Sequence, residues 1–156
     1  MKTIVKLSLA LNVALVLALG LASYVFVVGG NVEPSPDGRA AILVTTAERD
    51  HVLGEMRGFV EILQSITQAL ASNDMKTVAE TARAAGMKKT QGESPAFMRK
   101  LPLEFKKLGF DTHRKLDALA DLAATNPAPE VILGRVSQLM LNCVACHQSY
   151  LMKATD

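Results

Sequence analysis

The sequence has no tryptophan and few aromatic residues, and this lack argues against two classes of protein. Aromatic residues make up 4% of the 156-residue chain. Proteins that recognise RNA by base stacking need aromatic platforms, and β-sandwiches need many strands rich in aromatic and β-branched residues. The composition favours neither class, and the length suits a single domain.

The chain also lacks a large excess of charge of one sign. It has 17 Lys and Arg residues against 15 Asp and Glu residues. Lys2 and Lys6 account for the excess, because residues 31–156 carry 15 of each sign. A nucleic-acid-binding surface needs clustered basic residues to neutralise phosphates, so we expect no nucleic-acid partner.

No charged residue lies between Lys6 and Glu33, and residues 7–30 are mostly apolar. At about 1.5 Å per residue this run can cross a bilayer core of roughly 30 Å. Lysines on its N-terminal side place that end in the cytoplasm and predict export of the rest to the periplasm. We assign residues 1–30 to a membrane anchor or a signal segment. The anchor is favoured, because signal peptides have a shorter apolar run, but small residues around Gly20 leave a cleavage site open.

The following segment is rich in glycine and proline. Two prolines and three glycines lie between Gly29 and Arg39, and such a composition predicts a tether without regular structure. We therefore expect a linker over residues 31–45, followed by an exported domain over residues 46–156.

Apolar residues in the exported domain recur at steps of three and four, which is the period of one helix face. The pattern predicts a first helix over residues 46–71 with Thr46 as its N-cap. A second helix should begin after Asp74 and end at Gly86.

Two further helical segments complete the domain. The third should begin at Ser94 and Pro95, with breaks near Pro102 and Gly109. The fourth should begin near Pro129 and carry Tyr150 on its apolar face. No segment alternates with a period of two, so the predicted fold is all-α, an antiparallel four-helix bundle with an N-terminal apolar helix.

The two cysteines of the chain form one motif, Cys143-Val144-Ala145-Cys146-His147. This C-x-x-C-H spacing is typical of covalent attachment of haem c. On a helix, Cys143, Cys146 and His147 lie on one side, so two thiols can bind the haem vinyl groups while the imidazole binds the iron. The motif continues the apolar face of Val136 and Leu139, which predicts a haem inside the bundle.

Three other functions of the cysteines were weighed. A disulfide within one helix would link nothing distant, and a thiol-disulfide oxidoreductase would place the pair after a strand. A zinc site would need further ligands, and His51 and His113 have no recognisable ligand spacing. Both histidines are expected to face solvent.

A C-x-x-C-H motif in the last helix of a four-helix bundle resembles the cytochrome c′ family, over about residues 45–153. The resemblance implies one haem c, a periplasmic location and a homodimer paired through the first two helices. In that family an arginine of the first helix approaches the haem propionates, and an apolar residue four positions later covers the open iron face. Arg49 and Leu53 match this spacing. The family commonly has a basic residue after the position of Tyr150, where this chain has Leu151.

The sixth position of the iron decides between two expected functions. If Leu53 covers the iron, the site stays five-coordinate and binds small diatomic molecules such as NO or CO. If Met56 reaches the iron, His147 and Met56 form a six-coordinate, low-spin electron carrier. Methionine also fills cores, and that is the simpler role for Met56. The periodicity places no catalytic acid–base pair beside the haem, so we expect a protein that is not an enzyme and that meets a redox partner in the periplasm or membrane.

Overall fold

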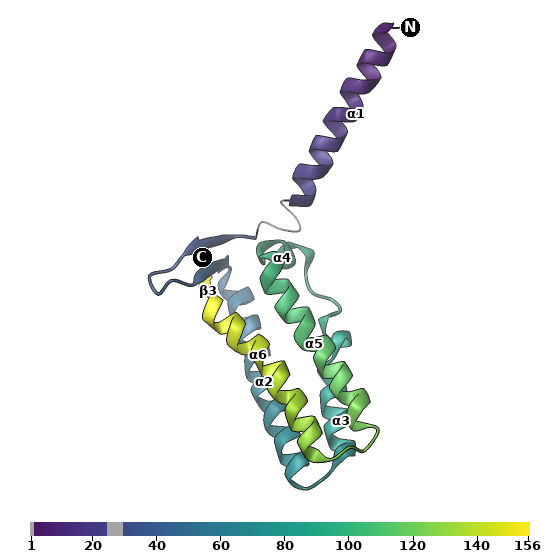
Figure 1. Ribbon diagram of the computed structural model, residues 1–156. Coiled ribbons are helices and arrows are strands. Elements are labelled where there is room, and N and C mark those ends of the chain that lie inside the picture. Colours follow the sequence, from purple (N-terminus) through teal and green to yellow (C-terminus); the bar gives the residue numbers. More distant parts are fainter. Residues whose placement is uncertain (1, 25–29) are drawn as a thin grey trace.

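The computed structural model describes residues 2–24 and 30–156 (Figure 1). The chain is mostly helical, as predicted. Its helices are α1 (Lys2–Ser23), α2 (Thr46–Ala71), α3 (Met75–Ala84), α4 (Pro95–Lys100), α5 (Leu103–Ala123) and α6 (Pro129–Ser149), with a short 3₁₀ helix, η2 (Met87–Thr90). Its strands are β1 (Val32–Pro34), β2 (Ala40–Val44) and β3 (Tyr150–Ala154).

Helix α1 is apolar and stands apart from the other helices in Figure 1. Its segment Val5–Ser23 is 19 residues long and mostly apolar, with Lys6 near its start, and none of it is buried in the protein. This length is enough to cross a membrane. The small residues around Gly20 that leave a cleavage site open lie within α1, whereas residues 25–29 of the expected anchor or signal segment are outside the described part of the chain.

A three-stranded sheet lies beside one end of the helices. This sheet was not predicted from the sequence. Strand β2 pairs with β1 in the antiparallel direction and with β3 in the parallel direction, with Ala40 opposite Tyr150 and Val44 opposite Ala154. The segment expected to be an unstructured linker therefore contains two strands. Its residues Ile42 and Val44 are almost fully buried, and their burial against the helices stabilises the sheet.

Helices α2, α3, α5 and α6 lie side by side and form the bundle (Figure 1). The predicted range of α2 is confirmed, but its N-cap is Thr45 instead of Thr46. The Thr45 hydroxyl accepts from the Glu48 N–H, and the Glu48 carboxylate accepts from the Thr45 N–H, which is a capping box. Asp74 caps α3 as predicted, by accepting from the Thr77 N–H at 3.0 Å.

The third predicted segment consists of two helices. Leu101 and Pro102 separate α4 from α5, because a proline and the residue before it disfavour a continuous helix. The break expected near Gly109 is wrong, since α5 continues through this residue. The predicted start of α6 at Pro129 is confirmed, but Tyr150 begins β3 and is not part of the helix.

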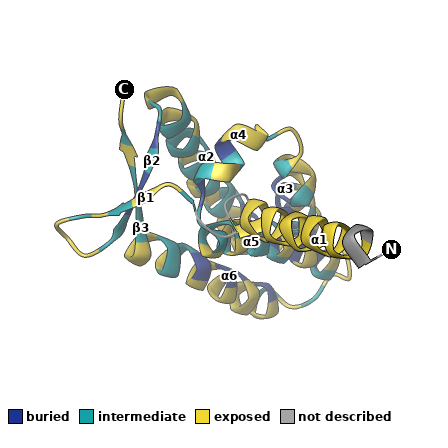
Figure 2. Cartoon of the chain, turned by 90° about the horizontal axis from the view of Figure 1, so that it is seen from above, coloured by how far each residue is buried: buried dark blue, intermediate teal, exposed yellow. Residues whose placement is uncertain are grey.

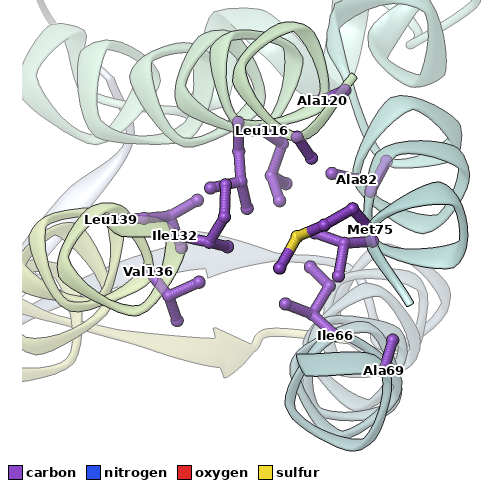
Figure 3. Close-up of a cluster of buried hydrophobic side chains, with 13 residues drawn as sticks. Ile66, Ala69, Met75, Ala82, Leu116, Ala120, Ile132, Val136 and Leu139 are labelled. Atoms are coloured by element: carbon purple, nitrogen blue, oxygen red, sulfur yellow. The ribbon is translucent and has the colours of Figure 1, made fainter. Parts of the chain in front are cut away.

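The core consists of two separate clusters. Figure 3 shows the larger one, in which side chains of α2, α3, α5 and α6 point toward one another. Its members include Ile66, Leu116 and Ile132, which are at most 1% exposed. The smaller cluster joins the sheet to α4 through Ile42, Val44, Phe97 and Leu101. Figure 2 shows that buried residues lie on the inward sides of these helices, whereas α1 is exposed over residues 5–23.

Candidate functional site

A cavity of about 500 Å³, which we call the central cavity, lies between the two core clusters. Phe59 and Leu63, which pack on the larger cluster, line one part of its wall. Phe97 and Leu101 of the smaller cluster line another part. Its volume falls within the range of about 300–1,000 Å³ that is usual for cofactor and small-molecule sites.

The C-x-x-C-H motif lies in the last two turns of α6 and lines this cavity. Cys143 and Cys146 are half-buried and are not joined by a disulfide. His147 is exposed overall, but it also lines the cavity. The structure therefore brings all three predicted haem-binding residues to one wall of one cavity.

Burial changes the acidity of both thiols. It raises the pKa of Cys143, and it raises the pKa of Cys146 to about 11, with a smaller contribution from the neighbouring Cys143. Both cysteines are therefore protonated at neutral pH. Catalytic thiols in redox enzymes have a lowered pKa, whereas the pKa values of these two cysteines are shifted upward.

A buried polar network fixes α6 to α5 immediately before the motif. Asn142 is 8% exposed. Its amide donates to Asp111 at 2.9 Å and to the Thr112 hydroxyl at 3.3 Å, and its carbonyl accepts from Lys115 at 3.0 Å. This network was not predicted from the sequence. The available signal was a polar residue, Asn142, directly before Cys143 on an apolar helix face.

The sheet holds the other end of the motif. The Tyr150 N–H donates to the carbonyl of Cys146, and the Tyr150 ring packs edge-on against Phe105 with the ring centres 5.5 Å apart. Arg39, which precedes β2, donates to the carbonyls of His147 at 3.3 Å and of Tyr150 at 3.4 Å. The motif is therefore supported at both ends by parts of the chain far away in sequence.

The wall formed by α2 contains two of the three residues predicted there. Leu53 and Met56 are half-buried and line the cavity. Arg49 is not among the lining residues, and its guanidinium pairs with Asp50 at 3.3 Å. Three other cationic residues line the cavity instead, namely Arg57, Lys89 and Lys106.

The two remaining histidines also line the cavity. His51 is exposed, as expected, and contacts the Glu93 carboxylate at 3.2 Å. The expectation that His113 faces solvent is wrong. His113 is half-buried, its Nδ1 lies 2.7 Å from the Ala85 carbonyl oxygen, and its ring centre lies 5.4 Å from that of Phe59.

The site differs from one built for a bare metal ion. Within residues 2–24 and 30–156, no three His, Cys, Asp or Glu side chains are placed so that they could bind one ion together. No protein-family model, curated protein or solved structure matches this chain. Its function is therefore inferred from the motif and the cavity.

Proposed function

We propose that this protein is a membrane-tethered c-type cytochrome with one haem. Cys143 and Cys146 would bind the haem covalently, and His147 would bind its iron. The observation that carries the proposal is the position of the central cavity, which separates the two core clusters at the level of the motif. The cavity is partly open to solvent and its lining is mostly apolar, and a mostly apolar cleft of this size is typical of a cofactor or ligand site.

The residues present fit a haem. The lining is mainly aromatic and aliphatic, which suits the apolar porphyrin ring, with Phe59, Phe97 and Phe105 among the large side chains. The two thiols are free and face the same space as the imidazole. Arg57 would provide positive charge for the haem propionates, as would Lys89, which pairs with the Glu55 carboxylate at 3.2 Å in this structure.

A bound haem would supply a one-electron iron couple whose potential depends on the axial ligands and on burial. The chain would control both. Apolar residues of α2, α4 and α5 would surround the porphyrin ring, and the bonds from Arg39 and Tyr150 hold the end of α6 that carries His147. These features suit an electron carrier, which changes little in structure between its oxidised and reduced forms.

Helix α1 suggests where the protein works. An apolar stretch over Val5–Ser23 preceded by Lys2 supports an anchor with its N-terminus in the cytoplasm. The cytochrome domain would then lie on the periplasmic side and exchange electrons with a partner in or near the membrane.

The competing function is a thiol-disulfide oxidoreductase. It is disfavoured because burial raises the pKa of both thiols, whereas such enzymes need a stabilised thiolate. The pair also lies within a helix instead of following a strand.

Covalent haem attachment to the two cysteines tests the proposal. The full chain should be produced in cells that mature c-type cytochromes, denatured, and extracted with acidified acetone, which removes haem that is not covalently bound. We expect haem to stay with the parent chain and to be lost in the double variant Cys143→Ser/Cys146→Ser. Val144→Ala, a change at an exposed position within the same motif, should retain haem. Complete extraction of haem from the parent chain would contradict the proposal.

A further inference from the structure

We propose that His113 would bind the haem iron through Nε2, as a second protein ligand in addition to His147. The inference rests on the proposed haem attachment and identifies the residue that completes the site. It assigns a role to a histidine that has no recognisable ligand spacing in the sequence.

The position of His113 is the first argument. It lies on α5 and lines the central cavity together with Cys143, Cys146 and His147 of α6. Helical bundles commonly build cofactor sites from inward-facing side chains on different helices. Histidines on α5 and α6 that share one cavity have this arrangement.

The protonation of the ring is the second argument. Nδ1 of His113 lies 2.7 Å from the Ala85 carbonyl oxygen. A carbonyl oxygen only accepts hydrogen bonds, so Nδ1 is the donor, and in the neutral imidazole this leaves the lone pair on Nε2. Histidines that bind metals commonly donate through their other ring nitrogen in this way, which fixes the tautomer and the ring orientation.

The surroundings of Nε2 are the third argument. Among the described residues Nε2 has no hydrogen-bond partner. In that part of the chain, every fully buried side-chain nitrogen or oxygen atom has a hydrogen-bond partner. Since Nε2 has none, it is not fully buried, as expected for an atom that faces a cavity.

The carbonyl that orients His113 is itself held in place. Ala85 is the C-cap of α3 and is 1% exposed. Asp117, one turn after His113 on α5, accepts from the Met87 N–H at 2.8 Å and from Arg83 at 2.8 Å. Gly86 allows this approach, because an added Cβ would collide with the Asp117 carboxylate. The end of α3 is thus fastened to α5 around the acceptor of His113.

The alternative ligands on α2 are less well prepared. Leu53 has no atom that binds iron. Met56 has a thioether, but its side chain has three rotatable bonds and lines the cavity without a fixed conformation of its own. The ring of His113 is fixed by a hydrogen bond and by Phe59, so less conformational entropy is lost when it binds.

Ligation by two histidines has consequences for function. Both axial positions would be filled, so the iron would be low-spin and the site would favour electron transfer. A small ligand such as CO or NO would have to displace His113. The reduction potential would be lower than with methionine as the second ligand, because methionine ligation raises it.

The test compares absorption and electron paramagnetic resonance spectra of the purified holoprotein and its variants. His113→Asn keeps an amide that can donate to Ala85 but removes Nε2, and His113→Ala removes both. We expect a low-spin parent that does not bind CO, and variants that become high-spin, bind CO and return to low-spin when imidazole is added. Met56→Ala and His51→Ala are the matched controls at the cavity wall and should stay low-spin.

The outcomes separate the two proposals. A parent with covalent haem that is high-spin, or one that becomes high-spin only in Met56→Ala, would overturn the assignment of His113 and leave the cytochrome function intact. A chain without covalent haem would overturn the cytochrome function and, with it, the role of His113. Circular dichroism shows whether each variant keeps the helical content of the parent.

Discussion

At the scale of single residues, buried polar side chains hold the candidate site in place. Asn142 and His113 each make specific hydrogen bonds to neighbouring helices from positions that line the central cavity. Sequence reasoning assigned His113 to solvent because Arg114 and Lys115 follow it. A helical signal was present, since Gly109, Thr112 and His113 share one face of α5 by their spacing.

We predict that Asn142→Ala lowers the free energy of unfolding by about 1–3 kcal/mol, because Asp111 and Thr112 lose a buried partner. Denaturant unfolding followed by circular dichroism measures the change. Gln138→Ala, at an exposed position one turn earlier on α6, is the control and should change stability little. An effect of Asn142→Ala no larger than that of the control would show that the network contributes nothing.

Asp117 gives a prediction for acid conditions. The hydrogen bond from the Met87 N–H, aided by Arg83, lowers the pKa of Asp117 below its ordinary value. The stability that this carboxylate provides is present above the ordinary aspartate pKa of about 3.9 and is lost as the pH falls through the lowered value. Asp117→Asn should therefore lose less stability than the parent between about pH 5 and pH 3. Glu61→Gln, an exposed carboxylate on α2, controls for the loss of one charge, and equal slopes for the parent and Asp117→Asn would contradict the prediction.

At the scale of elements, the helices were predictable and the sheet was not. The starts of α2 and α6 follow from local spacing and from Pro129. Strand β2 is a continuous apolar run that is buried on the inside of the protein, and β3 begins directly after a helix. Their pairing joins residues 40–44 to residues 150–154, and a contact over that distance in sequence leaves no local signal.

The cap of α2 distinguishes the structure from the sequence-based prediction. Thr45 forms the capping box, whereas Thr46 contacts Asp156 through its N–H at 2.7 Å and its hydroxyl at 2.8 Å. We predict that Thr45→Ala lowers the free energy of unfolding by about 1 kcal/mol. Thr46→Ala removes only an exposed side-chain contact near the C-terminus and should cost less. Thermal or denaturant unfolding would contradict the structure if Thr46→Ala were the more damaging change.

At the scale of the whole molecule, the structure has three parts: an apolar helix, a helical bundle with the central cavity, and a small sheet that pairs residues 40–44 with residues 150–154. The motif and its chemistry were read from the sequence. The central cavity was not, because it depends on how α2, α4, α5 and α6 pack together. The separation of the core into two clusters shows where a large apolar group would complete the packing.

The apolar helix predicts how the protein distributes in the cell. With α1 present, the chain should sediment with membranes and resist a carbonate wash, because the mostly apolar 19-residue segment Val5–Ser23 is long enough to cross the bilayer. A variant in which residues 1–30 are replaced by a cleavable secretion signal should appear in the soluble periplasmic fraction. Release of the parent by carbonate would show that α1 does not anchor it.

The intact mass of the purified full chain tests the central claim most directly. One covalent haem adds about 0.6 kDa to the polypeptide, and the protein should show this increase even after denaturation, with neither Cys143 nor Cys146 open to alkylation. A mass equal to that of the polypeptide alone, with two alkylated thiols, would contradict the assignment of this protein as a c-type cytochrome.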